Sequence, residues 1–339
     1  MNDSVLRIKS PADLLALVPC VIGFHPQDSL VLVALAGEGS NLHARVDLMA
    51  DDEVLDASLA VLVTATRRNG AHTVALVAYT ADPLLAEDAV DQLSDVLDEI
   101  GVEVVVAIRA DEGRWYSLDC DDDCCPPEGR PYDLSTHPFT AQSVLDGKVT
   151  FRSRQELVDS LLPVDLDQVD AVAAAAAEAT RRLETADRDA FGVRELHGRR
   201  RHLVTEGRWV RDRVRGYLVT REPLDAHEVG RLVAALTCAD VRDVAWSEMT
   251  RENAPDHVHL WRDVVQRTPL DLLAAPAGLL GFAAWLSGDG ALAWCAVDRC
   301  READPGYHMA GLLAQTLLGA IPPSTWRPIA ADDLPLFAG

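Results

Sequence analysis

The sequence lacks the features of exported and membrane-spanning proteins. It opens Met1-Asn2-Asp3-Ser4, without a basic segment followed by an apolar one, so we find no secretory signal. The longest apolar runs are too short, or are interrupted as by Pro276 and Gly281, to span a bilayer. The seven cysteines are an odd number, and reduced thiols are expected in a chain without export signals. We therefore expect a cytoplasmic protein that has no membrane contact.

Positive charge is also scarce, and lysine is nearly absent, with only Lys9 and Lys148. The net charge of −23 is unevenly spread. Residues 1–166 carry 11 Lys+Arg against 29 Asp+Glu, a balance of −18, whereas residues 167–339 carry 20 against 25, a balance of −5. An acidic surface repels phosphate backbones, so we do not expect nucleic acid as a partner.

Common catalytic signatures are missing as well. The sequence contains no Gly-x-Ser-x-Gly elbow and no His-Glu-x-x-His zinc motif. Gly37-Glu38-Gly39 falls in a predicted hairpin turn with no helix after it, so it does not have the context of a phosphate-binding loop. Whether the protein is an enzyme therefore stays open at the level of sequence.

What the first part of the chain does contain is an alternation of strand and helix patterns. Ser10-Pro11-Ala12-Asp13 predicts a short helix that ends before Pro19. A hairpin pattern follows, with strands at 29–35 and 42–49. A helix is then predicted at 52–69, a strand at 73–79, a helix at 82–100 and a strand at 102–108. This alternation favours parallel pairing with right-handed crossovers, and residues 114–118 then return antiparallel. We predict an α/β domain with a mixed, mainly parallel sheet and flanking helices.

The second part of the chain shows helical patterns alone. Ser153 with Glu156, and Asp225 with Glu228, have the spacing of capping boxes. Further helices are predicted over residues 167–188, 272–286, 291–302 and 307–318. We therefore expect two domains: residues 1–150, an α/β sheet domain that includes an acidic loop with cysteines, and residues 151–339, an all-helical array.

Three passages carry a family resemblance. They are Gly23-Phe24-His25-Pro26-Gln27-Asp28-Ser29-Leu30-Val31, then Arg114-Trp115-Tyr116-Ser117 with Cys120 and Cys124-Cys125-Pro126, and finally Ala283-Ala284-Trp285-Leu286-Ser287-Gly288-Asp289-Gly290-Ala291-Leu292-Ala293-Trp294 with Asp304-Pro305-Gly306-Tyr307. The chain resembles an actinobacterial family of domains of unknown function, DUF4192, over nearly its whole length. The resemblance implies an intracellular protein, and it supplies no catalytic residues.

The first candidate site is the loop before the strand at 29–35. If this strand runs antiparallel to the others, its start lies beside their carboxyl ends, where open α/β sheets bind ligands. The residues that would meet there are His25, Gln27, Asp28, Asp51, Thr80, Asp82 and Arg109. A histidine near acidic groups can carry protons or bind a metal ion. The favoured alternative is a structured turn fixed by Pro26.

The second candidate site is a cysteine cluster in the acidic loop. Cys120, Cys124 and Cys125, with His137 as a fourth ligand, could hold zinc, although the spacing departs from usual zinc ligand pairs. The neighbouring aspartates raise the pKa of thiols and argue against redox chemistry, while they could hold calcium or magnesium instead. A structural loop or a disulfide is favoured. No cofactor is assigned, and zinc is the alternative.

The second part of the chain offers a basic stretch and a helical surface. Residues 181–221 hold 12 arginines against 6 acids, and Arg199-Arg200-Arg201-His202 could bind phosphate. A solvated or internally paired face is favoured. The segment from Ala283 to Trp294 loosely resembles one tetratricopeptide helix pair, and its tryptophans are expected in the core. A concave helical face would bind a partner protein.

Two functions follow from these patterns. The favoured one is a non-enzymatic binding or regulatory protein whose helical half engages a partner. The alternative is an enzyme or small-ligand sensor that uses the carboxyl edge of the sheet around His25 and Asp28, or a zinc-stabilised module.

Overall fold

A computed structural model describes residues 8–37, 42–120, 125–145, 149–188, 193–330 and 333–337, without the side chains of 36–37, 183–188 and 193–197. The chain divides into two compact units. The first comprises Met1–Leu157 with Leu318–Pro322, and the second comprises Val158–Leu317 with Pro323–Gly339. The observed division thus falls a few residues after the expected one, and a short later segment joins the first unit. There, the Asn69 side-chain amide donates to the Ala320 carbonyl at 3.1 Å.

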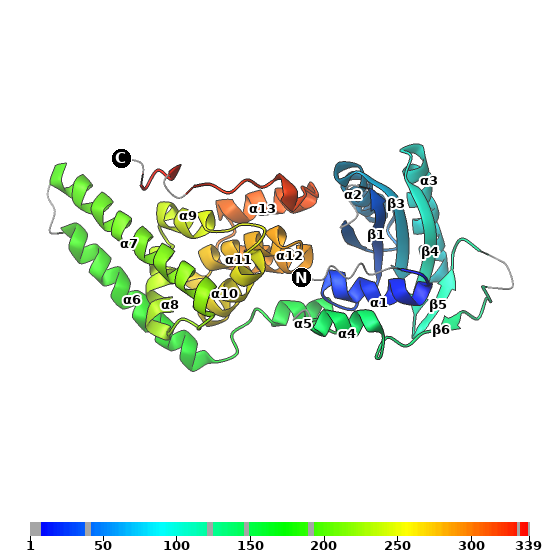
Figure 1. The fold of residues 1–339 in the computed structure, drawn as a ribbon, viewed down its shortest axis with the longest axis horizontal. Coiled ribbons are helices and arrows are strands. Elements are labelled where there is room, and N and C mark those ends of the chain that lie inside the picture. Colours follow the sequence, from blue (N-terminus) through cyan, green and yellow to red (C-terminus); the bar gives the residue numbers. More distant parts are fainter. Residues whose placement is uncertain are drawn as a thin grey trace. The chain divides into compact units, whose positions relative to one another are not determined.

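The first unit is built on a six-stranded sheet with the order β2-β1-β3-β4-β5-β6 (Figure 1). Its strands are β1 (Ser29–Gly37), β2 (His43–Asp47), β3 (Ala71–Tyr79), β4 (Glu103–Asp111), β5 (Arg114–Ser117) and β6 (Arg130–Pro131). Its helices are α1 (Pro11–Ile22), α2 (Asp52–Asn69), α3 (Pro83–Glu99) and α4 (Pro138–Leu145), and α5 (Arg154–Asp159) leads into the second unit.

The expectation of a mainly parallel sheet is wrong. Among the described strands, only β3 and β4 pair in parallel, and the other four pairings are antiparallel. The reason is the position of β1. The hairpin with β2 was predicted, but β1 also pairs on its other side with β3, antiparallel, and so separates β2 from β3. The strand-helix-strand unit β2-α2-β3 therefore joins strands that are not neighbours.

Helix ends in this unit follow local capping chemistry. Ser10 caps α1 by accepting from the Asp13 amide, and Gly70 ends α2 in the left-handed conformation that glycine favours. The predicted end of α1 before Pro19 is wrong, because the helix continues through this proline to Ile22. Proline removes one helical hydrogen bond, but Val18, Pro19 and Ile22 are all buried, and this packing offsets the loss.

Both faces of the sheet are covered. One face packs against α2 and α3, and its cluster includes Leu30, Leu32, Leu76, Leu62 and Leu93. Side chains alternate along a strand, so Val31, Val33, Ala75 and Val77 point to the other face, where they are also buried. The buried residues of α1 do not belong to the first cluster, which places α1 on this second face. The interior strands are therefore apolar on both sides, as their continuous apolar runs require.

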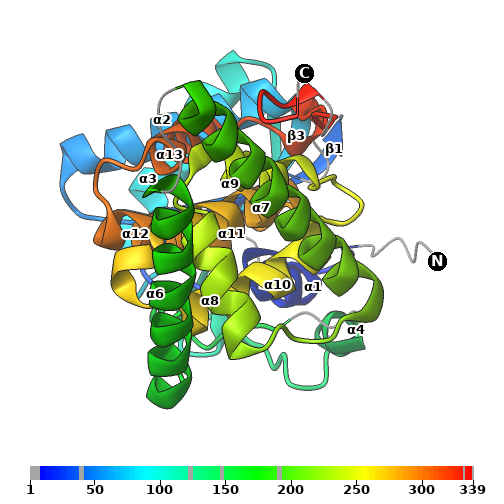
Figure 2. The same cartoon turned by 90° about the vertical axis from the view of Figure 1, so that its left-hand side faces the viewer.

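The second unit is largely helical. Its helices are α6 (Leu166–Arg188), α7 (Val193–Thr220), α8 (Ala226–Ala235), α9 (Ala239–Ser247), α10 (Ala254–Arg267), α11 (Ala274–Leu286), α12 (Gly290–Ala303) and α13 (His308–Leu318), with short 3-10 turns at Leu270–Leu272 and Pro323–Thr325. Figure 2 shows α6, α7, α8 and α10 facing the viewer, with α11 behind them. Asp225 and Glu228 form the capping box that the sequence predicts at the start of α8.

The alanine run of α6 has a packing role. A Cβ atom on Gly230 of α8 would lie 2.5 Å from the Cβ of Ala175 and 2.7 Å from the backbone nitrogen of Ala176. Helices α6 and α8 therefore approach so closely that only small side chains fit between them. The interior of α11 is apolar all round, and Trp285, expected in the core, is 7% exposed. Trp294, also expected there, is only half-buried.

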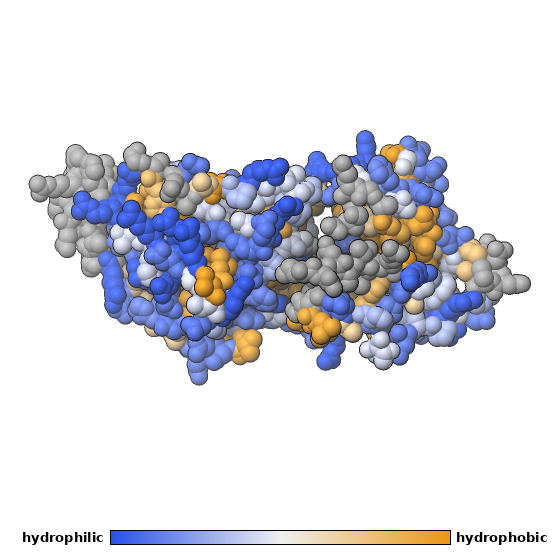
Figure 3. All heavy atoms as spheres, viewed as in Figure 1, coloured by the Kyte–Doolittle hydropathy of each residue, from blue (hydrophilic) through white to orange (hydrophobic). Residues whose placement is uncertain are grey.

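None of the described helices has both the length and the apolar composition of a membrane span. On the face drawn in Figure 3, hydrophilic residues predominate over the helical unit, and its apolar side chains form small separate patches.

Candidate functional site

The carboxyl edge of the sheet gathers polar residues from separate parts of the chain. Ser29, the first residue of β1, pairs with Asp47 at the end of β2 and with Tyr79 at the end of β3, and Tyr79 pairs with Ala110 near the end of β4. The loop before β1 thus lies beside three carboxyl ends. This edge holds His25, Gln27, Asp28, Thr80 and Arg109, as the sequence predicts.

Arg109 is the most constrained residue of this edge. Its side chain is buried, and Nη1 donates to the Thr80 carbonyl at 3.1 Å and lies 3.3 Å from a carboxylate oxygen of Asp111. The guanidinium also stacks on the Tyr116 ring, 3.9 Å from its centroid. Arg109 therefore already has protein partners on several sides, and it holds β3, β4 and β5 together.

The loop before β1 is anchored through its backbone. The His25 amide donates to the Phe151 carbonyl at 3.0 Å, and the Asp28 carbonyl accepts from the Leu48 amide at 2.8 Å. Asp28 has a φ of 43°, a left-handed conformation that aspartate tolerates. The side chains of His25, Gln27 and Asp28 are exposed. Neighbouring protein atoms still desolvate the imidazole enough to lower the pKa of His25.

The two other predicted acids of this edge cap helices. Asp51 accepts from the Val54 amide at 3.1 Å at the start of α2. Asp82 accepts from the Leu84 and Leu85 amides at 3.0 and 3.2 Å at the start of α3. Each carboxylate therefore has a structural partner in the positive first turn of a helix.

The edge also holds two tyrosines that sequence reasoning missed. Tyr79 ends β3, and its hydroxyl is buried with no hydrogen-bond partner among the described residues. Burial raises the pKa of Tyr79, and Tyr132 contributes to this rise. Burial likewise raises the pKa of Tyr132, helped by the charge of Asp111. Tyr132 follows β6, and β6 and β5 are separated in sequence by the acidic loop. No local sequence pattern could therefore assign Tyr132 to this edge.

The cysteine loop lies at the other end of the sheet. Strand β5 runs antiparallel to β4, and the Leu118 amide bonds to the Ala107 carbonyl, so Cys120 is carried away from His25. Cys124, with the aspartates 121–123, lies outside the described residues. His137 is engaged elsewhere: Nε2 lies 3.1 Å from Asp13 Oδ1, and Nδ1 accepts from the Phe139 amide at 3.2 Å. Within the described part of the chain, no cluster of three metal-ligating side chains occurs.

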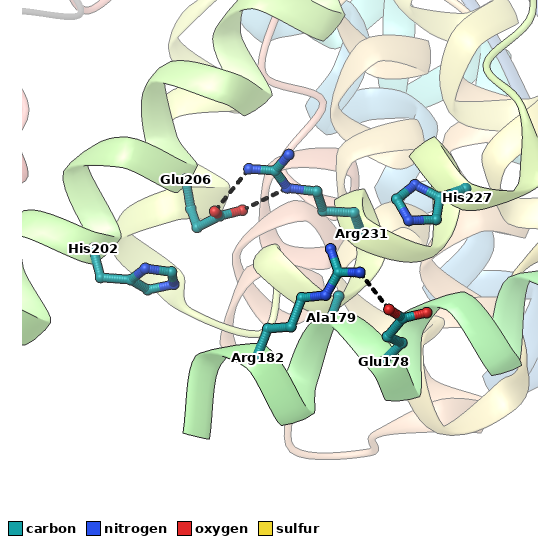
Figure 4. A pocket seen from close by; sticks show the side chains of 7 residues that line it. All are labelled: Glu178, Ala179, Arg182, His202, Glu206, His227 and Arg231. Atoms are coloured by element: carbon teal, nitrogen blue, oxygen red, sulfur yellow. Dashed lines mark hydrogen bonds and ion pairs between the residues drawn. The ribbon is translucent and has the colours of Figure 1, made fainter. Parts of the chain in front are cut away.

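The helical unit contains a cavity of about 220 Å³ between α6, α7 and α8 (Figure 4). It is lined by Glu178, Ala179, Arg182, His202, Glu206, His227 and Arg231. Glu206 is buried and receives two hydrogen bonds from Arg231, at 3.1 and 2.9 Å. The Arg231 guanidinium in turn lies over the Trp209 ring, 4.2 Å from its centroid. These contacts fix one wall of the cavity.

The α6 side of the cavity carries an exposed ion pair. Arg182 and Glu178 form an ion pair one turn apart on α6, with side chains 68% and 48% exposed. His202 lines the cavity from α7, and its Nε2 atom is buried without a hydrogen-bond partner among the described residues. Such an atom is uncommon, because buried polar groups are nearly always bonded. Among the described basic side chains of the stretch 181–221, His202 and Arg182 line this cavity.

A comparison with protein families identifies the chain. The model of one family, described as a domain of unknown function (DUF4192), matches residues 11–324. The chain belongs to the DUF4192 family. No curated protein and no solved structure matches the chain significantly. The match covers the carboxyl edge of the sheet and the cavity, so both features lie within the DUF4192 part of the chain.

Residues 333–337, which follow the DUF4192 match, pack against the helical unit. We call Asp333–Phe337 the tail segment, and the surface formed by Gly207 and Arg211 of α7 with Val244 of α9 the tail groove. A Cβ atom on Gly207 would lie 2.6 Å from Leu336 Cδ2 and 3.3 Å from Val244 Cγ2. The Arg211 guanidinium lies over the Phe337 ring, 5.1 Å from its centroid. Figure 1 shows the end of the chain beside α7 and α9.

The tail segment is held mainly by side chains. Leu334 and Leu336 are 5% and 4% exposed. Its backbone hydrogen bonds are local, from the Phe337 amide to the Leu334 carbonyl and from the Asp333 amide to the Ala330 carbonyl. The tail groove thus lies within the DUF4192 match, whereas its occupant lies beyond residue 324.

The arginines of the basic stretch pair with acids of the same unit. Arg213 bonds to Glu228 at 2.9 Å, and Arg215 bonds to both carboxylate oxygens of Glu248, at 2.7 and 3.0 Å. The sequence favours a solvated or internally paired face over phosphate binding. The acidic partners of Arg213 and Arg215 come from α8 and from the residue that follows α9.

Proposed function

We propose that the protein is a non-enzymatic binding protein whose helical unit engages a partner protein. The partner contributes a short segment with leucine and aromatic side chains, which docks in the tail groove. One observation carries this proposal: the tail segment of the chain itself occupies the groove, with Leu336 against Gly207. A groove that accepts such a segment from its own chain has the shape and the apolar lining to accept a similar one from another.

The strength of the internal contact is compatible with exchange. Burying a leucine side chain is worth about 1.5–3 kcal/mol. Two buried leucines, with no backbone bond to α7 among the described residues, make a contact that a competing segment can displace. The internal segment has the advantage of its tether, which gives it an effective concentration on the order of millimolar. A partner must therefore bind better than the tail or arrive with additional contacts.

The test uses the full-length chain with Leu336→Asp, which places a charge in the apolar groove and releases the tail segment. A fluorescent peptide with the natural sequence of residues 327–339 is titrated against it, and anisotropy is measured. We expect the Leu336→Asp chain to bind the peptide roughly tenfold or more tightly than the natural chain does, because the tethered competitor is gone.

Two controls make the result specific. A peptide that carries Leu336→Asp should not bind. Adding Gly207→Val to the variant chain should abolish binding, because the new side chain occupies the position of the leucine methyl group. If the Leu336→Asp chain is folded by circular dichroism and binds none of the natural peptide, the proposal is wrong.

A second candidate function is small-ligand binding at the carboxyl edge of the sheet. It is favoured by the Tyr79 hydroxyl, which is buried without a described partner near the meeting point of the strand ends. This candidate predicts that the imidazole resonances of His25 shift in a saturable way when inorganic phosphate or a small carboxylate is added to the labelled full-length chain. Unchanged His25 resonances with every probe would reject it.

A further inference from the structure

Helices α2 and α3 expose large apolar side chains at the ends where both helices begin. The two helices pack side by side on one face of the sheet, and both start at its carboxyl edge (Figure 1). Leu84, in the first turn of α3, is 74% exposed, and Val54, in the first turn of α2, is 40% exposed. Met49, just before α2, is 51% exposed. Apolar side chains that gather at one place on a surface are typical of interaction sites.

The surface of α3 beyond Leu84 is acidic. Four exposed carboxylates, those of Glu87, Asp91, Asp95 and Glu99, follow one another at four-residue spacing and so lie along one line of the helix. We call these four residues the acidic stripe. The sequence has no lysine or arginine between Arg68 and Arg109. The ion pairs described for the first unit involve other acids.

The acidic stripe is unfavourable for the helix that carries it. Like charges four residues apart on a helix repel each other. Asp98 and Glu99 also place negative charge in the last turn, at the negative end of the helix dipole, where α3 has no basic side chain. A cation bound along the stripe would offset both effects. The local arrangement of α3, beyond the net charge of the chain, therefore favours a positively charged partner.

The spacing of the stripe and its apolar end together define the kind of partner. With a helical rise of about 1.5 Å per residue, the carboxylates repeat about every 6 Å over a length of about 18 Å. A second helix with lysine or arginine at every fourth residue repeats at the same distance. A leucine-sized side chain at the end of such a helix would cover Leu84. A polyamine lacks this apolar group, and nucleic acid carries charge of the wrong sign.

We propose that the acidic stripe, with Leu84 at its end, docks a cationic amphipathic helix of a partner protein. Ammonium or guanidinium groups of that helix pair with the four carboxylates, and an apolar side chain packs on Leu84 and Val54. Complementary charge of this kind speeds association and makes binding weaken as salt is added. This surface lies on the first unit and goes beyond the proposed function, because it shares no residue with the tail groove.

The experiment uses the full-length chain and a fluorescent peptide of about 20 residues, which is long enough to form a helix. The peptide carries lysine at every fourth position on one face, leucine at one end of that face, and alanine and glutamine elsewhere. Anisotropy is measured at low salt, and we expect saturable one-to-one binding. A peptide of the same composition with its lysines spread around the helix should bind roughly fivefold or more weakly, because fewer of its charges reach the stripe.

Variants of the chain locate the site. Asp91→Asn with Asp95→Asn removes two exposed charges from the centre of the stripe and should weaken binding roughly fivefold or more. Leu84→Ser should weaken binding roughly threefold or more, because the apolar contact is lost. The matched control is Asp170→Asn with Asp212→Asn, which removes two exposed charges from α6 and α7 and should change the affinity by less than about twofold.

The variants replace exposed side chains, so all of them should fold, and circular dichroism checks this. Four results would each overturn the proposal. The natural chain does not bind the first peptide, or it binds both peptides equally well. The control variant weakens binding as much as the variant of the stripe does, or Leu84→Ser has no effect.

Discussion

His257 gives the helical unit a pH-dependent stability that can be calculated from its surroundings. The side chain lies on α10 and is fully buried. Nε2 is 3.3 Å from the Glu248 carbonyl, and Nδ1 has no hydrogen-bond partner among the described residues. Desolvation lowers the pKa of His257 from 6.5 to about 4, which outweighs the opposite effect of the Glu248 bond. The imidazole is therefore neutral in the folded protein at pH 7.

The sign and size of the effect follow from proton linkage. Between pH 6.5 and about 4 the unfolded chain binds a proton that the folded chain does not, so the free energy of unfolding falls as the pH falls. A difference of about 2.5 pKa units corresponds to roughly 3 kcal/mol once the pH is below 4. Between pH 7.5 and 5.0 the expected loss from this one group is about 2 kcal/mol.

The assay compares the natural chain with His257→Gln, whose side-chain amide can replace the Nε2 donor but does not titrate. Urea unfolding is followed by tryptophan fluorescence, which reports mainly on the helical unit because, of the seven tryptophans, only Trp115 lies in the first unit. The natural chain should lose about 2 kcal/mol more than the variant between pH 7.5 and 5.0. The matched control variant is His259→Gln, which replaces an exposed histidine on the same helix. Equal losses in the natural chain and in His257→Gln would refute the reasoning.

Two further predictions concern stability. Gly129→Ala should lower the free energy of unfolding by about 1–3 kcal/mol, and Gly113→Ala should lower it less, as measured by urea unfolding followed through circular dichroism. Both glycines have a positive φ, but only at Gly129 would the new Cβ lie 2.6 Å from Tyr116. Equal losses would contradict the steric argument. Arg231→Met should cost about 3–5 kcal/mol because it leaves the Glu206 carboxylate buried without its partner, and adding Glu206→Gln should restore part of this stability in a double-mutant cycle. Additive losses would show that the two side chains do not act as a pair.

Local patterns predicted the boundaries of several helices, because helix ends depend on neighbouring residues, whereas α4, α7, α9 and α10 were not predicted. Asp82 and Pro83 mark the start of α3, and Gly70 marks the end of α2, through bonds that span only a few residues. Strand order could not be obtained in the same way. The pairing of Leu32 with Leu76 joins residues far apart in sequence, and both strands would be equally apolar in another order.

The two candidate sites differ in the same way, because one follows from local patterns and the other from long-range packing. The carboxyl edge could be predicted in part, since strand ends that share a direction must share an edge of the sheet. The cavity could not, because Glu178, His202 and Arg231 come from three helices whose packing depends on a close approach at Gly230. A basic run in the sequence gives no indication of which of its members face a neighbouring helix.

The interior position of β1 determines how far the chain can be shortened. Residues 29–37 come early in the sequence, yet they are bonded to a strand on each side. A fragment that begins after Gly37 would detach β2 from the sheet and leave the apolar edge of β3 open, and open edges of this kind promote aggregation. All the described strand pairings involve residues after Ser10. A shorter version of the protein should therefore keep the whole of β1 and the residues that follow it.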